Sequence, residues 1–374
     1  MKPKNALASK KRNGTIELMR FVFCMEVILY HIVKRVELPT WGHFNFFLNG
    51  KIGVEFFFLV SGYLLAMSAK KQTDVPIAYS TKHFMFRKVF AILPCHIIAF
   101  IICITALLAY QADTGLFNLA KIAVTSIPSF LFIQKTGIPG REVIRPEWYI
   151  EAMLWAMLVV YPLLLKFRDK FSKIACPIIA VFLVGYMIHT TNRLGGTGRY
   201  VFGDTIAKVY VRAFGELCGG IFCFEAAQWL KGLQMKKAGR VCLTLMEFLC
   251  YAATLVYTVT DINDQFEGYF FYVLAVAITL SFSELTLTAE WAKTEAVYYL
   301  GRVSLPFYMA QTLPFTMLKY SARVQAMSPW MQVLFCVALS VGVGLVVYYL
   351  SIPFTRWLKK QINQKLGRPF FAAV

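Results

Sequence analysis

Apolar stretches of about twenty residues, separated by short polar and basic segments, recur along the whole chain. A helix of that length crosses the roughly 30 Å hydrocarbon layer of a membrane. The pattern predicts ten such helices, over residues 16–33, 52–69, 89–110, 148–165, 174–190, 205–229, 241–260, 269–288, 296–318 and 330–354. The hydrophobic periodicity therefore predicts an all-α, polytopic integral membrane protein with about ten transmembrane helices.

An eleventh apolar stretch, residues 116–133, is shorter and contains Lys121 and Pro128. Counting it as a span would move the basic cluster at residues 166–173 to the outside, against the tendency of basic loops to stay in the cytoplasm. We predict that this stretch is an interfacial or re-entrant segment.

Basic clusters predict the orientation of the helices. With ten spans, all of them fall on one side: the tail before residue 16, the loop 70–88, the clusters 166–173 and 231–240, and the tail after residue 355. Loops rich in Lys and Arg stay cytoplasmic, so both termini are predicted in the cytoplasm of a multi-pass cell-membrane protein. The predicted organisation is a basic tail over 1–15, a membrane domain over 16–355 and a second basic tail over 356–374.

Composition excludes the soluble alternatives. The chain of 374 residues has 39 Lys+Arg and 20 Asp+Glu, a net charge of +19, yet 58% of it is hydrophobic and only 16% is charged. Soluble domains carry about 25% charged residues. Because the basic residues lie between apolar stretches, the lipid bilayer is the expected partner and nucleic acid is not. The nine cysteines form no CxxC pair, so neither a disulfide framework nor a metal site is expected.

The first helix carries the ionisable residues Glu17, Arg20 and His31, which are costly in a bilayer, at about 2.5–3.5 kcal/mol each on insertion scales. Eleven residues separate Arg20 from His31, so both lie on one helix face roughly 16 Å apart. One interpretation is a polar face that neighbouring helices satisfy. The other is a general base, His31, at the end of a channel whose mouth is cationic.

Arg87 and Lys88 begin the third helix. Such residues anchor helix ends at the membrane interface. Alternatively, they could join Arg20 in holding the phosphates of an anionic cofactor at the cytoplasmic surface, since Arg binds phosphate in a forked geometry.

Four segments, in this order, resemble one family. They are Thr15 to His31 with its Arg-x10-His spacing, Gly53-Val54-Glu55-Phe56-Phe57-Phe58-Leu59-Val60-Ser61-Gly62-Tyr63, Arg87 to Pro94, and Leu300-Gly301-Arg302-Val303-Ser304-Leu305-Pro306-Phe307-Tyr308. Together they are similar to the motifs of acyltransferase family 3, membrane acyltransferases that modify surface polysaccharides and other envelope molecules. The resemblance covers about residues 12 to 355.

The resemblance implies a ten-helix enzyme that moves an acyl group, such as acetyl, from cytoplasmic acyl-CoA to a hydroxyl of an extracytoplasmic or lipid-linked glycan. Acyl-CoA would be a co-substrate, with no bound cofactor. By this resemblance His31 is the catalytic residue, as a general base or an acyl carrier. Arg20, Arg87 and Lys88 would bind the donor, and Glu17 would orient or neutralise Arg20.

Acceptor-binding residues are sought elsewhere. The long outer loop 111–146, with Arg141 and Arg145, and the Glu147 and Trp148 that follow it are predicted to dock the acceptor, since carbohydrates stack on aromatic rings and bond to charged groups; the alternative is that these residues only anchor the loop. Tyr308 ends the fourth motif and Gln311 follows it. The chain departs from the family pattern at Glu17, where Asp is common, at Ala91, where Arg is common, and at Gln311, where His is common. We predict that Gln311 forms hydrogen bonds with the acceptor rather than transferring a proton.

Other functions remain open alternatives. Ten helices with buried charges also describe a transporter or exporter of a polar or lipid-linked envelope precursor, although no inverted repeat is visible. A sensing or scaffolding module would use the charged face only for structure. The glycines at residue 62 and within 215–219 are interpreted as small-residue helix contacts, and the run Gly195-Gly196-Thr197-Gly198-Arg199 as a flexible outer loop. The sequence is compatible with a monomer or a homodimer.

Overall fold

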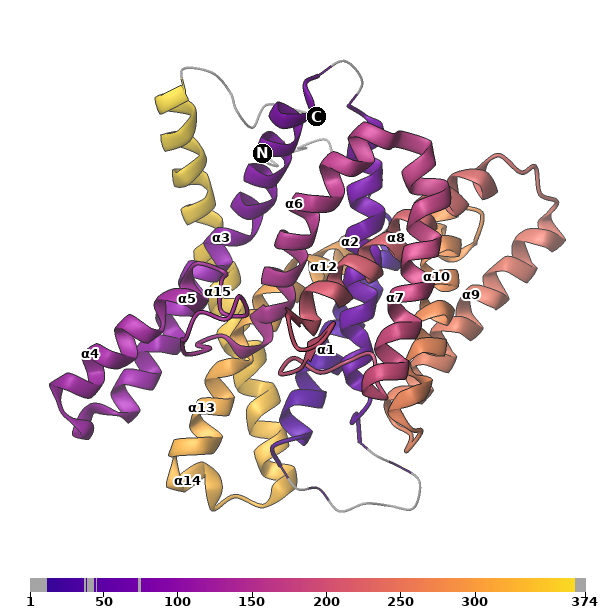
Figure 1. Ribbon diagram of the computed structural model, residues 1–374. Helices are drawn as coiled ribbons and strands as arrows, with labels where there is room; N and C mark the ends of the chain where they lie inside the picture. The colour runs from indigo at the N-terminus through magenta and orange to yellow at the C-terminus, as the bar shows by residue number, and fades with distance from the viewer. Residues whose placement is uncertain (1–11, 37, 39–43, 45, 73–74, 367–374) are drawn as a thin grey trace, which may run out of the picture.

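The computed structural model describes residues 12–36, 38, 44, 46–72 and 75–366, which form a bundle of helices (Figure 1). The helices are α1 (Gly14–Val33), α2 (Gly53–Lys70), α3 (Ile77–Tyr110), α4 (Leu116–Thr125), α5 (Ile127–Phe130), α6 (Trp148–Asp169), α7 (Cys176–Thr191), α8 (Lys208–Lys231), α9 (Lys237–Thr258), α10 (Glu267–Ser283), α11 (Thr288–Trp291), α12 (Glu295–Ala310), α13 (Thr312–Tyr320), α14 (Ala322–Gln325) and α15 (Pro329–Leu366). Short 3₁₀ turns cover Gly50–Ile52, Ala112–Thr114, Arg145–Glu147 and Asp264–Phe266, and a π-helical turn covers Lys170–Ala175. Strands β1 (Tyr200–Val201) and β2 (Ile206–Ala207) pair antiparallel. Residues 1–11 and 367–374 of the predicted basic tails lie outside the described residues.

Each predicted span overlaps a helix, with two differences of detail. The third helix begins at Ile77 rather than at residue 89, directly after Pro76. The span predicted over 296–318 is two helices, α12 and α13, with a break at Gln311. Pro314 explains the break, because its ring nitrogen cannot donate the helical hydrogen bond to the carbonyl of Ala310.

The prediction of an all-α protein is confirmed. Six segments are long and apolar enough to cross a membrane: Gly50–Lys70, Ile77–Tyr110, Arg145–Thr191, Lys237–Thr258, Asp264–Ser283 and Pro329–Gln364. The third of these holds both α6 and α7. The helices α1 and α8 are outside this set, and both bury ionisable side chains. The number of ten spans stays a prediction.

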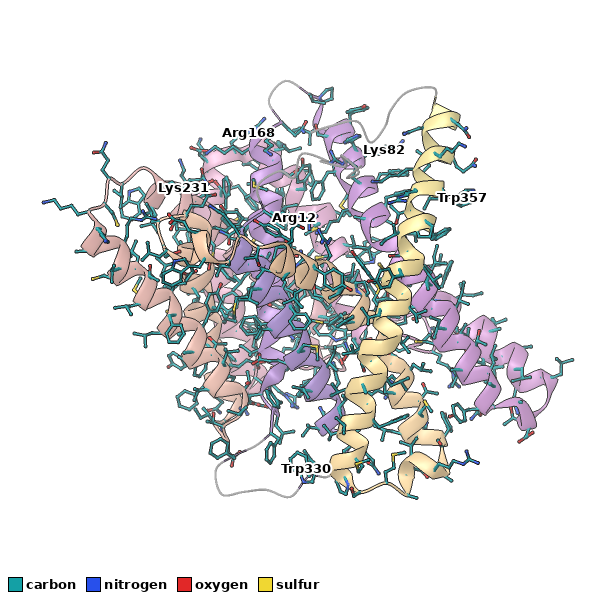
Figure 2. The ribbon with its side chains drawn as sticks, turned by 180° about the vertical axis from the view of Figure 1, so that it is seen from behind. Arg12, Lys82, Arg168, Lys231, Trp330 and Trp357 are labelled. Carbon is teal, nitrogen blue, oxygen red and sulfur yellow. The ribbon has the colours of Figure 1, made fainter. Side chains whose placement is uncertain are left out.

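Basic residues from four separate segments lie toward one end of the bundle. Figure 2 shows Arg12, Lys82, Arg168 and Lys231 in the upper half, and Trp330 at the opposite end. All four residues belong to segments that the sequence predicts on one side of the membrane. The arrangement agrees with that grouping, and the cytoplasmic assignment of this end stays a prediction.

Glycines allow α2 and α8 to pack closely, as the sequence predicted for Gly62. A Cβ atom on Gly62 would lie 2.2 Å from the carbonyl oxygen of Leu217, and one on Gly220 would lie 2.1 Å from that of Leu59. Neither position has room for a side chain. The backbone of α8 therefore meets α2 closely at Leu217, within the predicted 215–219 segment, and at Gly220, one residue beyond it.

Candidate active site

A cavity of about 900 Å³ lies where the end of α1 meets the start of α2 and the later part of α3. Residues 140–145, the start of α6, the loop 195–197 and helix α13 complete its walls. Among the elements that line it, α13 and the end of α1 lie toward the end of the bundle where α15 begins (Figure 1), and Arg12 lies on the other side of the bundle's middle (Figure 2). Two residues predicted for the site, His31 and Trp148, both line it.

His31 lies in the last turn of α1 and is partly exposed to the cavity. Its ring centre is 4.9 Å from that of Tyr30 and 6.0 Å from that of Phe315. Among the described residues, no hydrogen bond joins either ring nitrogen to a protein atom. Both nitrogens are therefore available to a molecule in the cavity, and the described neighbouring helices do not satisfy this polar group.

The segment before α6 is held in place by two buried contacts. The Nδ1 atom of His96 on α3 is 2.5 Å from Oε1 of Glu147, and its Nε2 atom is 2.9 Å from the carbonyl oxygen of Phe130. The hydroxyl of Tyr308 donates to the carbonyl of Pro146 at 2.6 Å. These contacts position Trp148, the next residue, at the cavity wall.

Sequence reasoning did not find the role of His96, because no spacing rule pairs two residues that are 51 positions apart. The tertiary structure makes it a partner of Glu147, and both side chains are almost fully buried. Tyr308 was predicted as an acceptor-binding residue, but its hydroxyl is used in a structural hydrogen bond to the carbonyl of Pro146 in this segment.

Gln311, another predicted acceptor-binding residue, lies at the break between α12 and α13. Its side chain is buried, and Nε2 donates to the carbonyl of Tyr308 at 2.7 Å. Its Oε1 atom has no hydrogen-bond partner among the described residues. Gln311 and Tyr308 do not line the cavity, whereas the neighbouring Thr312 does.

Arg212 on α8 reaches the cavity from a buried charged cluster. Its Nε atom is 2.6 Å from Glu216, and a second nitrogen pairs with Glu55 of the second sequence motif. The guanidinium also lies 5.3 Å from the centre of the Trp148 ring. The pairing with Glu216 follows from the i, i+4 spacing on one helix. The pairing with Glu55, on another helix, is visible only in the tertiary structure.

The glycine-containing loop that we interpreted as flexible is anchored on both sides. The Nζ atom of Lys208 donates to the carbonyls of Arg193 and Gly195, at 2.6 and 2.9 Å. One carboxylate oxygen of Glu267 accepts from the backbone N–H groups of Leu194 and Gly195, at 2.9 and 2.8 Å. These bonds hold the loop against the cavity.

The predicted donor-binding residues lie elsewhere, toward the other end of α1. The guanidinium of Arg20 is 3.3 Å from Glu17, and Lys88 is close enough to Arg20 for their charges to interact. Arg87 is exposed and lies near Tyr161. None of these residues lines the cavity. Arg20 and His31 are eleven positions apart on α1, which corresponds to roughly 16 Å along the helix.

Gly301 of the fourth motif accounts for the close contact between α1 and α12. A Cβ atom at this position would lie 1.9 Å from Oε2 of Glu17 and 2.8 Å from its Cβ atom. The glycine leaves the space in which Glu17 turns toward Arg20. Within the described ranges, no group of three or more His, Cys, Asp or Glu side chains is placed to hold a metal ion.

The arrangement places His31, whose ring nitrogens have no hydrogen-bond partner among the described residues, in a cavity at one end of α1, while Arg20 lies toward the other end of this helix, near Lys88 of α3. A family model described as an acyltransferase domain matches residues 13–349. No curated protein and no solved structure matched the chain. The matched region includes α1 to α14 and residues 329–349 of α15, and with them all four sequence motifs. The chain therefore belongs to acyltransferase family 3, whose members are membrane acyltransferases.

Proposed function

We propose that this membrane acyltransferase takes an acetyl group from acyl-CoA on the cytoplasmic side and transfers it to a hydroxyl of an extracytoplasmic or lipid-linked glycan. The observation that carries the proposal is the position of His31, whose ring lines a cavity of about 900 Å³ that Trp148 also lines and has no hydrogen-bond partner among the described residues. Trp148 offers the aromatic face on which a sugar ring can stack. The product would be an ester on an envelope molecule.

In the proposed reaction, an imidazole nitrogen of His31 accepts the proton of the acceptor hydroxyl as its oxygen attacks the thioester carbonyl. The new C–O bond forms, the C–S bond breaks, and the leaving CoA thiolate takes the proton that His31 accepted, which restores the neutral imidazole. General-base catalysis of this kind contributes about 10²–10⁴-fold to rate. A covalent acyl-histidine would be the alternative route through the same residue.

The donor side of the proposal uses the cations at the other end of α1. Arg20, Arg87 and Lys88 would hold the phosphates of CoA, and the extended pantetheine arm would carry the thioester along the helix toward His31. Glu17, 3.3 Å from Arg20, would fix the direction of its guanidinium. Gln311 is left out of the proposed acceptor site, because its side chain is buried and does not line the cavity.

The test is CoA release by membranes that contain the wild-type protein, His31→Ala or His189→Ala at matched expression. His189 is exposed in the last turn of α7 and does not line the cavity, so it is the matched control. Acetyl-, succinyl- and longer acyl-CoAs are offered with and without cell-envelope extract. We expect acetyl-CoA turnover that depends on the extract and falls about 10²-fold or more only in His31→Ala.

A His31→Ala protein that keeps the wild-type rate would refute the catalytic assignment. If no acyl-CoA is consumed by the folded wild-type protein, the acyltransfer proposal fails. Flux of an envelope precursor that is lost in His31→Ala without any CoA release would support the exporter instead.

A further inference from the structure

The cavity beside His31 is strongly cationic. Among the described residues that line it, seven are lysines or arginines and one is acidic, Glu142, which pairs with Lys135 outside the lining. The cationic residues are Lys34, Arg35, Lys51, Arg141, Arg145, Arg212 and Lys319. A neutral sugar needs no such concentration of charge, because uncharged hydroxyls are satisfied by neutral partners as well.

Two of the seven cations are neutralised within the protein. Lys51 lies 2.5 Å from Asp264, and Arg212 pairs with two buried glutamates. The other five have no carboxylate within 4 Å in the part of the chain that the structure describes: Lys34, Arg35, Arg141, Arg145 and Lys319. The cavity therefore keeps an excess of positive charge.

Arg35 is held next to His31 by contacts with neutral groups, and no carboxylate of the described residues pairs with it. One of its guanidinium nitrogens donates to the backbone carbonyl of His31 at 2.5 Å, and the guanidinium lies 4.0 Å from the centre of the Phe315 ring. Burial and the nearby charge of Arg145 lower the pKa of Arg35 from its usual 12.5 to about 10, so it remains a cation at neutral pH.

Arg145 is brought to the same place by the segment that precedes α6. The two residues after it, Pro146 and Glu147, are held by Tyr308 and His96 through buried hydrogen bonds. The fold thus fixes two arginines near each other, against their mutual repulsion, at the mouth of the proposed catalytic centre. An anion between them would relieve that repulsion and could accept hydrogen bonds from both guanidinium groups.

We propose that the acceptor is an anionic hydroxyl compound, a glycan or sugar that bears a phosphate or carboxylate, and that Arg35 and Arg145 bind this group and present a neighbouring hydroxyl to His31. The proposal rests on the proposed acyltransfer function. The acceptor is the favoured source of the anion because the cations proposed for the donor, Arg20 and Lys88, lie away from this cavity.

Binding is tested first, without any turnover. Purified protein in neutral-detergent micelles is heated in pyrophosphate or in chloride at equal ionic strength. The variants are Arg35→Gln/Arg145→Gln and the control Arg323→Gln, which removes an exposed positive charge on α14, outside the cavity. We expect pyrophosphate to raise the Tm of the wild type and of Arg323→Gln, and not that of the double variant. Equal Tm values in both salts for the wild type would overturn the anion site.

Acceptor preference is tested next, with labelled acetyl-CoA and envelope extract separated by anion exchange into neutral and anionic fractions. We expect label in the anionic fraction, and a KM for that fraction at least 10-fold higher in Arg145→Gln than in Arg323→Gln. The KM for acetyl-CoA should be unchanged. Label only in the neutral fraction would overturn the inference while leaving the proposed acyltransfer standing. Absence of any CoA release would instead count against the acyltransfer itself.

Two further outcomes identify other sources of the anion, and either would overturn the acceptor assignment. A higher KM for acetyl-CoA in Arg145→Gln, with the acceptor KM unchanged, would assign the arginines to the phosphates of CoA. Inhibition by phosphatidylglycerol in phosphatidylcholine nanodiscs that requires Arg145, without an effect of Arg145→Gln on acceptor KM, would assign them to lipid headgroups.

Discussion

The buried pair of His96 and Glu147 makes a sharp prediction about stability. Replacing His96 by leucine keeps most of the side-chain volume but removes both of its hydrogen bonds, to Glu147 at 2.5 Å and to the carbonyl of Phe130 at 2.9 Å. Glu147 is then left buried, and its Oε2 atom already has no partner among the described residues. Breaking one side of a buried polar pair costs about 3–5 kcal/mol when the remaining group is charged. We expect His96→Leu to lower the free energy of unfolding by that amount.

A double-mutant cycle separates the pair from the loss of packing. Glu147→Met should also destabilise the protein, because it removes the partner of His96. The double variant His96→Leu/Glu147→Met should recover much of the loss, since replacing both members of a buried pair by apolar groups is often close to neutral. The control is His189→Leu, at an exposed position, where we expect a change within about 0.5 kcal/mol.

The assay is equilibrium unfolding of the purified variants in mixed micelles, followed by intrinsic tryptophan fluorescence. A His96→Leu variant whose free energy of unfolding is within about 1 kcal/mol of the wild-type value would refute the reasoning, because burying a carboxylate without a partner costs more free energy than that. A double variant whose loss equals the sum of the two single losses would show that the two side chains are not coupled.

Three further substitutions test the packing and the buried charges of the bundle. Gly301→Val puts a Cβ atom 1.9 Å from Oε2 of Glu17. We expect it to lower the yield of folded protein and, because it displaces the partner of Arg20, the proposed donor-binding arginine, to raise the KM for acyl-CoA. A wild-type yield and KM would contradict this. Gly62→Leu places its Cβ atom 2.2 Å from the carbonyl of Leu217, so a loss of at least about 1–3 kcal/mol from overpacking should appear as a lower Tm, and an unchanged Tm would show that α2 and α8 can move apart. Arg212→Gln leaves two buried glutamates without their cation, for which we expect about 3–5 kcal/mol of destabilisation in the same unfolding assay, and a loss below 1 kcal/mol would mean that the glutamates are neutral in the folded protein.

Much of the helical framework could be predicted from the sequence. A crossing of the hydrocarbon layer requires about twenty apolar residues, and this requirement marks the six long apolar segments without reference to their neighbours. Exceptions came from single residues, such as Pro314, which divides the helix predicted over 296–318. Helical periodicity also placed Arg20 and His31 on one face of α1, because 3.6 residues per turn is a local property.

Part of the candidate site was predictable for the same local reason. His31 and Trp148 were selected from motifs and composition, and both line the cavity. Arg145 was selected only as one charged residue of the outer loop predicted to dock the acceptor. Arg35 was not selected, because charged residues next to a helix end are ordinarily interface anchors. Their significance depends on their shared position in the cavity.

Only the tertiary structure decided which buried charges are partners. His96 meets Glu147 across 51 positions, and Glu55 meets Arg212 across 157. A sequence shows that a charge within an apolar helix needs a partner, since an unpaired charge in a low-dielectric interior is costly. It does not show which of the available groups will supply it, because that choice is made by the way the helices pack, through contacts between residues far apart in the chain.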